Sequence, residues 1–99
     1  MKNFRKFSLA AEFYRQCCQL TLKAHAKDQL LIASQSIALN LAEGRRKPTV
    51  KDQKRFFHIS FGSTRECQAI LILQQLEDTE IWELLDKLAA HLYRLIQQA

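Results

Sequence analysis

Helix-breaking residues are almost missing from this 99-residue chain, which holds two glycines and one proline. β-Sandwiches and barrels use both residue types repeatedly in their tight turns, so the sequence excludes an all-β fold. The glycines, Gly44 and Gly62, stand too far apart to form the glycine-rich loop of a dinucleotide-binding fold. The sequence therefore predicts an all-helical protein and, at this length, one domain over residues 1–99.

Hydrophobic side chains recur at three- and four-residue steps in four successive segments, the spacing typical of amphipathic helices. In the first segment the apolar positions run from 4 to 22, and Asn3 or Ser8 is available to cap its start. In the second segment Asp28 is the expected N-cap. Gly44 stands at its end, where a left-handed residue is favoured.

The third segment is the longest and is expected over about 50–76. Thr49 precedes Asp52 by three residues, which is the spacing of a capping box at a helix start. The fourth segment begins at a cap formed by Asp78 or Thr79. Because short connections join helices that run in opposite directions, we expect an antiparallel up-down-up-down four-helix bundle.

The second and third segments carry more hydrophobic surface than one packing seam needs. Phe56 and Phe57 are adjacent, so their side chains point about 100° apart and one is expected to face away from its own core. Small residues, among them Ser60, Gly62 and Ser63, gather in the middle of the third segment and would let another helix approach closely. We expect a homo-oligomer whose interface uses Phe57, Ser60 and Gly62. The alternative is that these groups pack inside one subunit.

Positive charge is concentrated in one stretch of the chain. Lysine and arginine number 15 against 10 acidic residues, a net charge of +5. Six of these cations fall within residues 45–55, namely Arg45, Arg46, Lys47, Lys51, Lys54 and Arg55. A basic loop that leads into a helix start suits phosphate groups, so we expect these six to contact an RNA or DNA backbone. The alternative is a solvated loop. Residues 45–55 hold no aromatic side chain, so the run itself is not expected to stack bases.

Polar residues share faces of the second and third segments. Ser36, Asn40 and Glu43 are spaced i, i+4 and i+7, and Ser63 and Glu66 are spaced i, i+3. We interpret these five residues as a structural network between the two helices that fixes their register. The alternative is a catalytic pair of carboxylates, which would need a cleft that nothing in the sequence supplies.

The sequence gives little support for ribonuclease activity, disulfide bonds or metal binding. Arg55 and His58 lie three residues apart, a spacing that matches helical ribonucleases poorly. Cys17, Cys18 and Cys67 are odd in number and the histidines are scattered, so we expect reduced cysteines and neither a disulfide framework nor a zinc site. No enzyme activity, cofactor or metal is expected.

The sequence also bears on location. Residues 29–42 form the longest uncharged stretch, which is too short and too polar to span a membrane. The basic N-terminus lacks the apolar run of a signal peptide. We therefore expect a cytoplasmic protein with no membrane partner.

Two blocks of sequence resemble a known family. Residues 36–44 read Ser-Ile-Ala-Leu-Asn-Leu-Ala-Glu-Gly and resemble its signature Ser-Ile-x-x-Asn-Ile-Ala-Glu-Gly. Residues 56–66 read Phe-Phe-His-Ile-Ser-Phe-Gly-Ser-Thr-Arg-Glu and are similar to its Arg-Phe-x-x-Ile-Ala-x-Gly-Ser-x-x-Glu. The family comprises small four-helix-bundle proteins encoded in intervening sequences of bacterial 23S rRNA genes. Its relatives include the accessory variability determinant of diversity-generating retroelements. The chain departs from the family at Ala38, where members usually have proline.

The resemblance implies a homopentameric, barrel-like assembly with a basic surface. For the retroelement relatives it implies an accessory role that binds a reverse transcriptase and its RNA, and for the intervening-sequence members it implies no established activity. We therefore expect a non-enzymatic, oligomeric accessory protein that binds nucleic acid, with a reverse transcriptase as one candidate partner. The alternative is a protein-interaction scaffold that does not bind nucleic acid directly.

Overall fold

Four α-helices make up the computed structural model, which describes residues 5–98. They are α1 (Arg5–Gln19), α2 (Ala24–Arg46), α3 (Val50–Leu73) and α4 (Glu80–Gln97). Because residues 5–98 contain no strand, the prediction of an all-helical chain with four helices is confirmed. The expected cap Asn3 and the first apolar position, Phe4, lie outside the described residues. Ser8 lies within α1, so it does not cap this helix.

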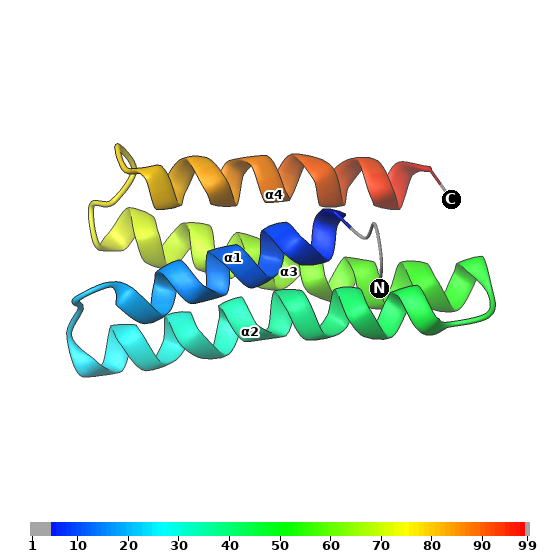
Figure 1. Cartoon of the computed structure of the whole chain (residues 1–99), viewed down its shortest axis with the longest axis horizontal. Coiled ribbons are helices and arrows are strands. Elements are labelled where there is room, and N and C mark those ends of the chain that lie inside the picture. Colours follow the sequence, from blue (N-terminus) through cyan, green and yellow to red (C-terminus); the bar gives the residue numbers. More distant parts are fainter. Residues whose placement is uncertain (1–4, 99) are drawn as a thin grey trace.

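Each helix packs against two others. In Figure 1 consecutive helices lie alongside one another and run in opposite directions. α2 contacts α1 and α3, and α4 closes the arrangement by contacting α3 and α1. The α2–α3 pair has the most extensive contact of the four, and the molecule measures 40 × 23 × 21 Å.

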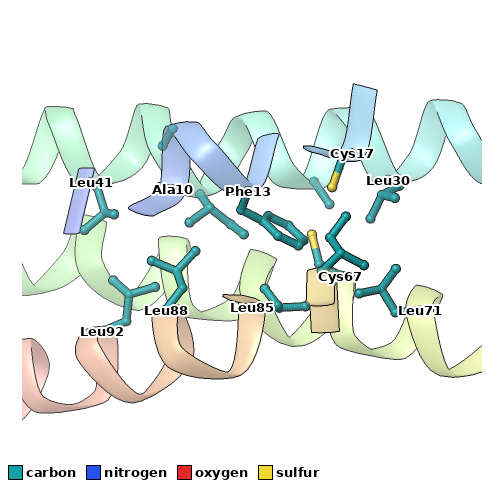
Figure 2. Packing of buried hydrophobic residues seen from close by; sticks show 14 of the residues in the cluster. Ala10, Phe13, Cys17, Leu30, Leu41, Cys67, Leu71, Leu85, Leu88 and Leu92 are labelled. Atoms are coloured by element: carbon teal, nitrogen blue, oxygen red, sulfur yellow. The ribbon is translucent and has the colours of Figure 1, made fainter. Parts of the chain in front are cut away.

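The core runs along the space enclosed by all four helices (Figure 2). Its largest fully buried side chains include Phe13 from α1, Leu41 from α2, Leu71 from α3 and Leu88 from α4. Burial of a side chain of this size stabilises a protein by about 1.5–3 kcal/mol, so these contacts supply most of the drive for the helices to associate.

Two of the predicted helix starts are confirmed by hydrogen bonds. The Thr49 hydroxyl accepts a bond from the Asp52 backbone N–H at 3.2 Å, and α3 begins one residue later. Thr79, rather than Asp78, caps α4, because its hydroxyl accepts from the Trp82 N–H at 3.3 Å. α3 ends earlier than predicted. Gln75 takes a left-handed φ of 59°, which ends the helical path before position 76.

α2 differs from the prediction at both ends. It begins at Ala24 rather than after Asp28, and its N-cap residue, Lys23, makes no side-chain capping bond. The prediction that Gly44 ends the helix in a left-handed conformation is wrong, because α2 continues to Arg46 and residues 5–98 contain no glycine with positive φ. Gly44 instead allows the Phe57 ring of α3 to approach the α2 backbone closely. A Cβ added there would lie 2.7 Å from the Phe57 ring.

Candidate nucleic-acid interface

The fold gathers the six predicted phosphate-binding residues at one end of the α2–α3 pair (Figure 1). Their positions follow the chain through the connection between the two helices. Arg45 and Arg46 end α2, Lys47 lies in the connection, and Lys51, Lys54 and Arg55 occupy the first turns of α3. Lys47 and Lys54 are half-buried and the other four are exposed. The Thr49 cap begins α3 within this cluster, so the partial positive charge of a helix N-terminus adds to that of the side chains.

Glu43 faces this basic end. Its carboxylate is 2.8 Å from the Lys47 ammonium and 3.5 Å from the Arg46 guanidinium. The hydrogen bond from Lys47 lowers the pKa of the Glu43 carboxyl, and the charges of Lys47 and Arg46 lower it further. The carboxylate therefore stays ionised at neutral pH and offsets part of the positive charge on Lys47 and Arg46.

An aromatic ring lies among the cations, although residues 45–55 contain none. The Lys47 Nζ and the Arg55 guanidinium carbon each lie 5.0 Å from the centroid of the half-buried Phe56 ring. Cation–π attraction therefore fixes both charged groups to the surface of the bundle. Sequence reasoning missed this role for Phe56 even though the residue follows directly after Arg55.

Part of the predicted polar network forms at the middle of the α2–α3 pair. The Ser36 and Ser63 hydroxyls lie 2.8 Å apart, and Asn40 Nδ2 donates to the Ser36 carbonyl at 2.9 Å and to its hydroxyl at 3.0 Å. These contacts join the helices in one register. Glu43 joins the basic end instead, and Glu66 lies exposed on α3.

The positions of the two carboxylates argue against a catalytic pair. Glu43 and Glu66 lie on opposite sides of the Ser36–Ser63 contact, seven and three residues from it. At 1.5 Å per residue, they are about 15 Å apart along the helix axes. General acid–base chemistry needs its two groups around a single reacting bond, so this arrangement does not support that reading.

Two of the predicted interface residues lie in the interior of the subunit. Ser60 is fully buried and its hydroxyl donates to the Ile37 carbonyl at 2.8 Å. Phe57 is only 5% exposed, and its ring packs close to Gly44. Both belong to the face of α3 that packs on α2, so the expectation that they contact a second copy is corrected. Gly62 is exposed, and apart from its chain neighbours and the backbone of its own helix, no heavy atom of the described residues comes within 4 Å of a Cβ built there.

The surface of the α2–α3 pair carries exposed hydrophobic side chains near the serine contact. Ile32 and Leu39 lie two turns apart on α2 and are 70% and 60% exposed. Ile59, on α3, is 46% exposed one turn from Ser63. These side chains account for the hydrophobic surface of the second and third segments that exceeds the needs of one packing seam.

The cysteines are free thiols, as expected. Cys17 and Cys67 are buried in the core (Figure 2), and Cys18 is exposed. Burial raises the pKa of the Cys17 thiol to about 12 and also raises the pKa of Cys67. Within residues 5–98, no cluster of three or more histidine, cysteine or acidic side chains is arranged to hold a metal ion. None of the helices described here is long and apolar enough to cross a membrane.

The fold and the basic end define a small, basic, all-helical protein with a charged connection between its two longest helices. Residues 4–98 match the family model described as 23S rRNA-intervening sequence protein. Because the match covers nearly the whole sequence, the chain belongs to this family. Comparisons with curated proteins and with solved structures gave no match.

Proposed function

We propose that this protein is a non-enzymatic accessory protein that binds the sugar–phosphate backbone of RNA through the basic end of the α2–α3 pair. The observation that carries the proposal is the density of positive charge there, where six cations of an eleven-residue stretch surround one helix start. Phosphate contacts of this kind give affinity with little sequence preference.

The contacts around Phe56 divide the cations into two groups. Lys47 and Arg55 are held against the ring, and Lys47 also pairs with Glu43. Arg46 and Lys51 have exposed side chains that are freer to reach a phosphate. If each subunit neutralises two or three phosphates, the logarithm of the binding constant should fall with the logarithm of salt concentration with a slope of about −2 per subunit.

We further propose that the protein assembles with copies of itself through the exposed α2–α3 surface that carries Ile32, Leu39 and Ile59. Covering these side chains removes apolar area from water, which favours association. A pentamer of chains that carry +5 each would have a net charge of +25, and its field would attract RNA strongly at low salt. Sedimentation of the wild type at micromolar concentration tests this assembly, and a purely monomeric protein would refute it.

The test of RNA binding compares two double variants that each lose one ion-paired arginine and one exposed lysine. The site variant is Arg46→Ser with Lys51→Ser. The control is Arg15→Ser with Lys23→Ser, near the opposite end of the bundle, where Arg15 pairs with Glu12 at 3.1 Å. Both variants have the same net charge, so only the place of the lost charges differs.

Labelled duplex RNA is titrated at several salt concentrations. We expect the site variant to bind more weakly across all sequences and its salt slope to flatten by about 1 to 2, while the control stays close to the wild type. Equal affinities and equal slopes for the two variants would refute the assignment of the basic end.

The scaffold alternative rests on the same exposed hydrophobic surface of α2 and α3. A protein partner on that surface, with a reverse transcriptase as the candidate suggested by the retroelement relatives, would be held mainly by apolar contact. Its binding would change little with salt. A complex that persists in high salt and depends on Leu39 but not on Arg46 would favour this function.

A further inference from the structure

A hollow of about 300 Å³ lies between α3 and α4, away from the α2–α3 connection. Tyr93 of α4 stands at its side with 55% of its surface exposed. The ring is not loose, because Phe61 of α3 packs against it with the centroids 6.3 Å apart and the planes inclined by 50°. A supported tyrosine ring that still reaches solvent offers a platform on which another flat ring can stack.

Two arginines border this platform. The Arg65 guanidinium lies 4.7 Å from the Phe61 ring centroid and donates to the Gln68 side-chain oxygen at 2.9 Å. Arg94 follows Tyr93 on α4 and also lines the hollow. Arg65 is held in place by the ring and the amide, so its position is fixed before any ligand arrives.

One acidic residue decides what can enter the hollow. Asp86 also lines it, and its negative charge repels a phosphate group. A neutral flat ring with N–H donors is compatible with this carboxylate, whereas the arginines are compatible with phosphates outside the hollow. The lining therefore fits a nucleobase inside and its flanking phosphates at the rim.

Further cations lie on α4 and on α1, which contacts it. Partial burial lowers the pKa of His91, and repulsion by Arg94 and Lys87 of α4 and by Lys6 and Arg5 of α1 lowers it further. The charges of four cations from two helices thus act on one imidazole of α4, the helix that also contributes Tyr93 and Arg94 to the hollow. A polyanionic strand that lies across these two helices would be attracted by these charges.

One face of α3 leads from the basic end to the hollow. Lys54, His58, Phe61 and Arg65 follow at spacings of four, three and four residues, so they lie along one face of α3. From Lys54 to Arg65 this face extends about 16 Å at 1.5 Å per residue, a length that a few nucleotides cover. One strand can therefore contact both regions.

We propose that the hollow between α3 and α4 binds one unstacked base of single-stranded RNA against Tyr93, with Arg65 and Arg94 holding the phosphates on either side. The inference rests on the proposed RNA binding and adds a single-strand site to it. Duplex RNA keeps its bases stacked and paired, so it can contact the basic end without using Tyr93.

The test uses Tyr93→Ser, which removes the ring, and Tyr93→Phe, which keeps it. Binding of a labelled eight-nucleotide adenosine oligomer and of a duplex RNA is measured for both variants and for the wild type. Stacking on an aromatic residue contributes enough that Tyr93→Ser should weaken binding of the oligomer by about 5- to 100-fold. Tyr93→Phe should stay within about twofold of the wild type, and duplex binding should change by less than about twofold in either variant.

A second readout follows the proton resonances of the three histidines. Phosphates placed beside Arg94 should raise the pKa of His91 when the oligomer is added, whereas His25 serves as an internal reference. A Tyr93→Ser variant that binds the oligomer as well as the wild type, or an unchanged His91 titration, would overturn the single-strand site.

The two proposals fail in different ways. Loss of duplex binding in the Arg46→Ser, Lys51→Ser variant together with an unaffected Tyr93→Ser variant would leave the proposed function standing and remove the single-strand site. The opposite outcome is that Tyr93→Ser weakens oligomer binding while the Arg46→Ser, Lys51→Ser variant binds RNA like the wild type. That outcome would place RNA binding at the hollow and refute the assignment of the basic end as the RNA-binding site. A wild type that binds neither RNA would refute both proposals.

Discussion

The two glycines allow a test of whether the close approach of α2 and α3 requires glycine at position 44. Both lie inside helices, so replacing either by alanine should contribute a similar gain of about 1 kcal/mol in helix propensity. Their surroundings differ. A Cβ at Gly44 would come 2.7 Å from one atom of the Phe57 ring and 3.0 Å from the Phe56 Cβ, whereas at Gly62 the space is open to 4 Å among the described residues.

We expect Gly62→Ala to raise the free energy of unfolding by about 0.5–1 kcal/mol. Gly44→Ala gains the same propensity but forces the Phe57 ring and the α2–α3 contact apart, and overpacking of this kind costs about 1–3 kcal/mol. The two variants should therefore differ by about 1–3 kcal/mol in stability. For a domain of this size each kcal/mol moves Tm by about 4–8 °C.

Thermal and urea unfolding, followed by circular dichroism, measure this difference. A series of protein concentrations separates the stability of the subunit from any contribution of assembly. Equal upward shifts in Tm for the two alanine variants would refute the claim that Gly44 is required by the close approach of the Phe57 ring.

Four further predictions concern the core and the start of α3. Only Cys18 should react with a thiol reagent in the folded protein at pH 8, since Cys17 and Cys67 are buried and burial raises their pKa values; fast labelling of all three would contradict this. Because unfolded thiols ionise at lower pH than the two buried ones, stability should fall as the pH rises above about 9, as urea midpoints would reveal. Ser60→Ala should lower the free energy of unfolding by about 1 kcal/mol, because its buried hydroxyl bonds an α2 carbonyl; unchanged stability would contradict that role. Thr49→Ala should lose the α3 cap and about 0.5–2 kcal/mol, with Thr49→Ser as the control that retains it.

The helices could be predicted because hydrophobic residues recur at the helical spacing along the sequence. The cap at Thr49 could be predicted because its hydroxyl bonds a backbone N–H only three residues away. The start of α2 could not be predicted in the same way. Lys23 provides no side-chain cap. Instead, the Lys27 ammonium donates to the Cys18 carbonyl at 2.9 Å and to the Leu20 carbonyl, which ties the preceding connection to the helix. A lysine in that role looks like any exposed lysine in a sequence.

The candidate site was predictable in composition but not in arrangement. The run of cations is visible in the sequence, yet their division around Phe56 depends on how α2 and α3 cross. The same limit explains why Phe57 and Ser60 were predicted at an interface between copies although they lie inside the subunit. Their small or aromatic character suits a helix contact, but periodicity alone does not say whether the partner helix belongs to the same subunit. The hollow beside Tyr93 joins residues from two helices far apart in sequence, so no local pattern indicates it.

The extensive contact between α2 and α3 also has a kinetic consequence. Residues 47–49 alone connect these helices, and closing so short a loop costs little chain entropy. We therefore expect this helical hairpin to form early in folding, on the microsecond-to-millisecond timescale of proteins rich in local contacts. Substitutions at the Ser36–Ser63 contact should then slow folding, whereas truncation of Phe13 in α1 should mainly accelerate unfolding.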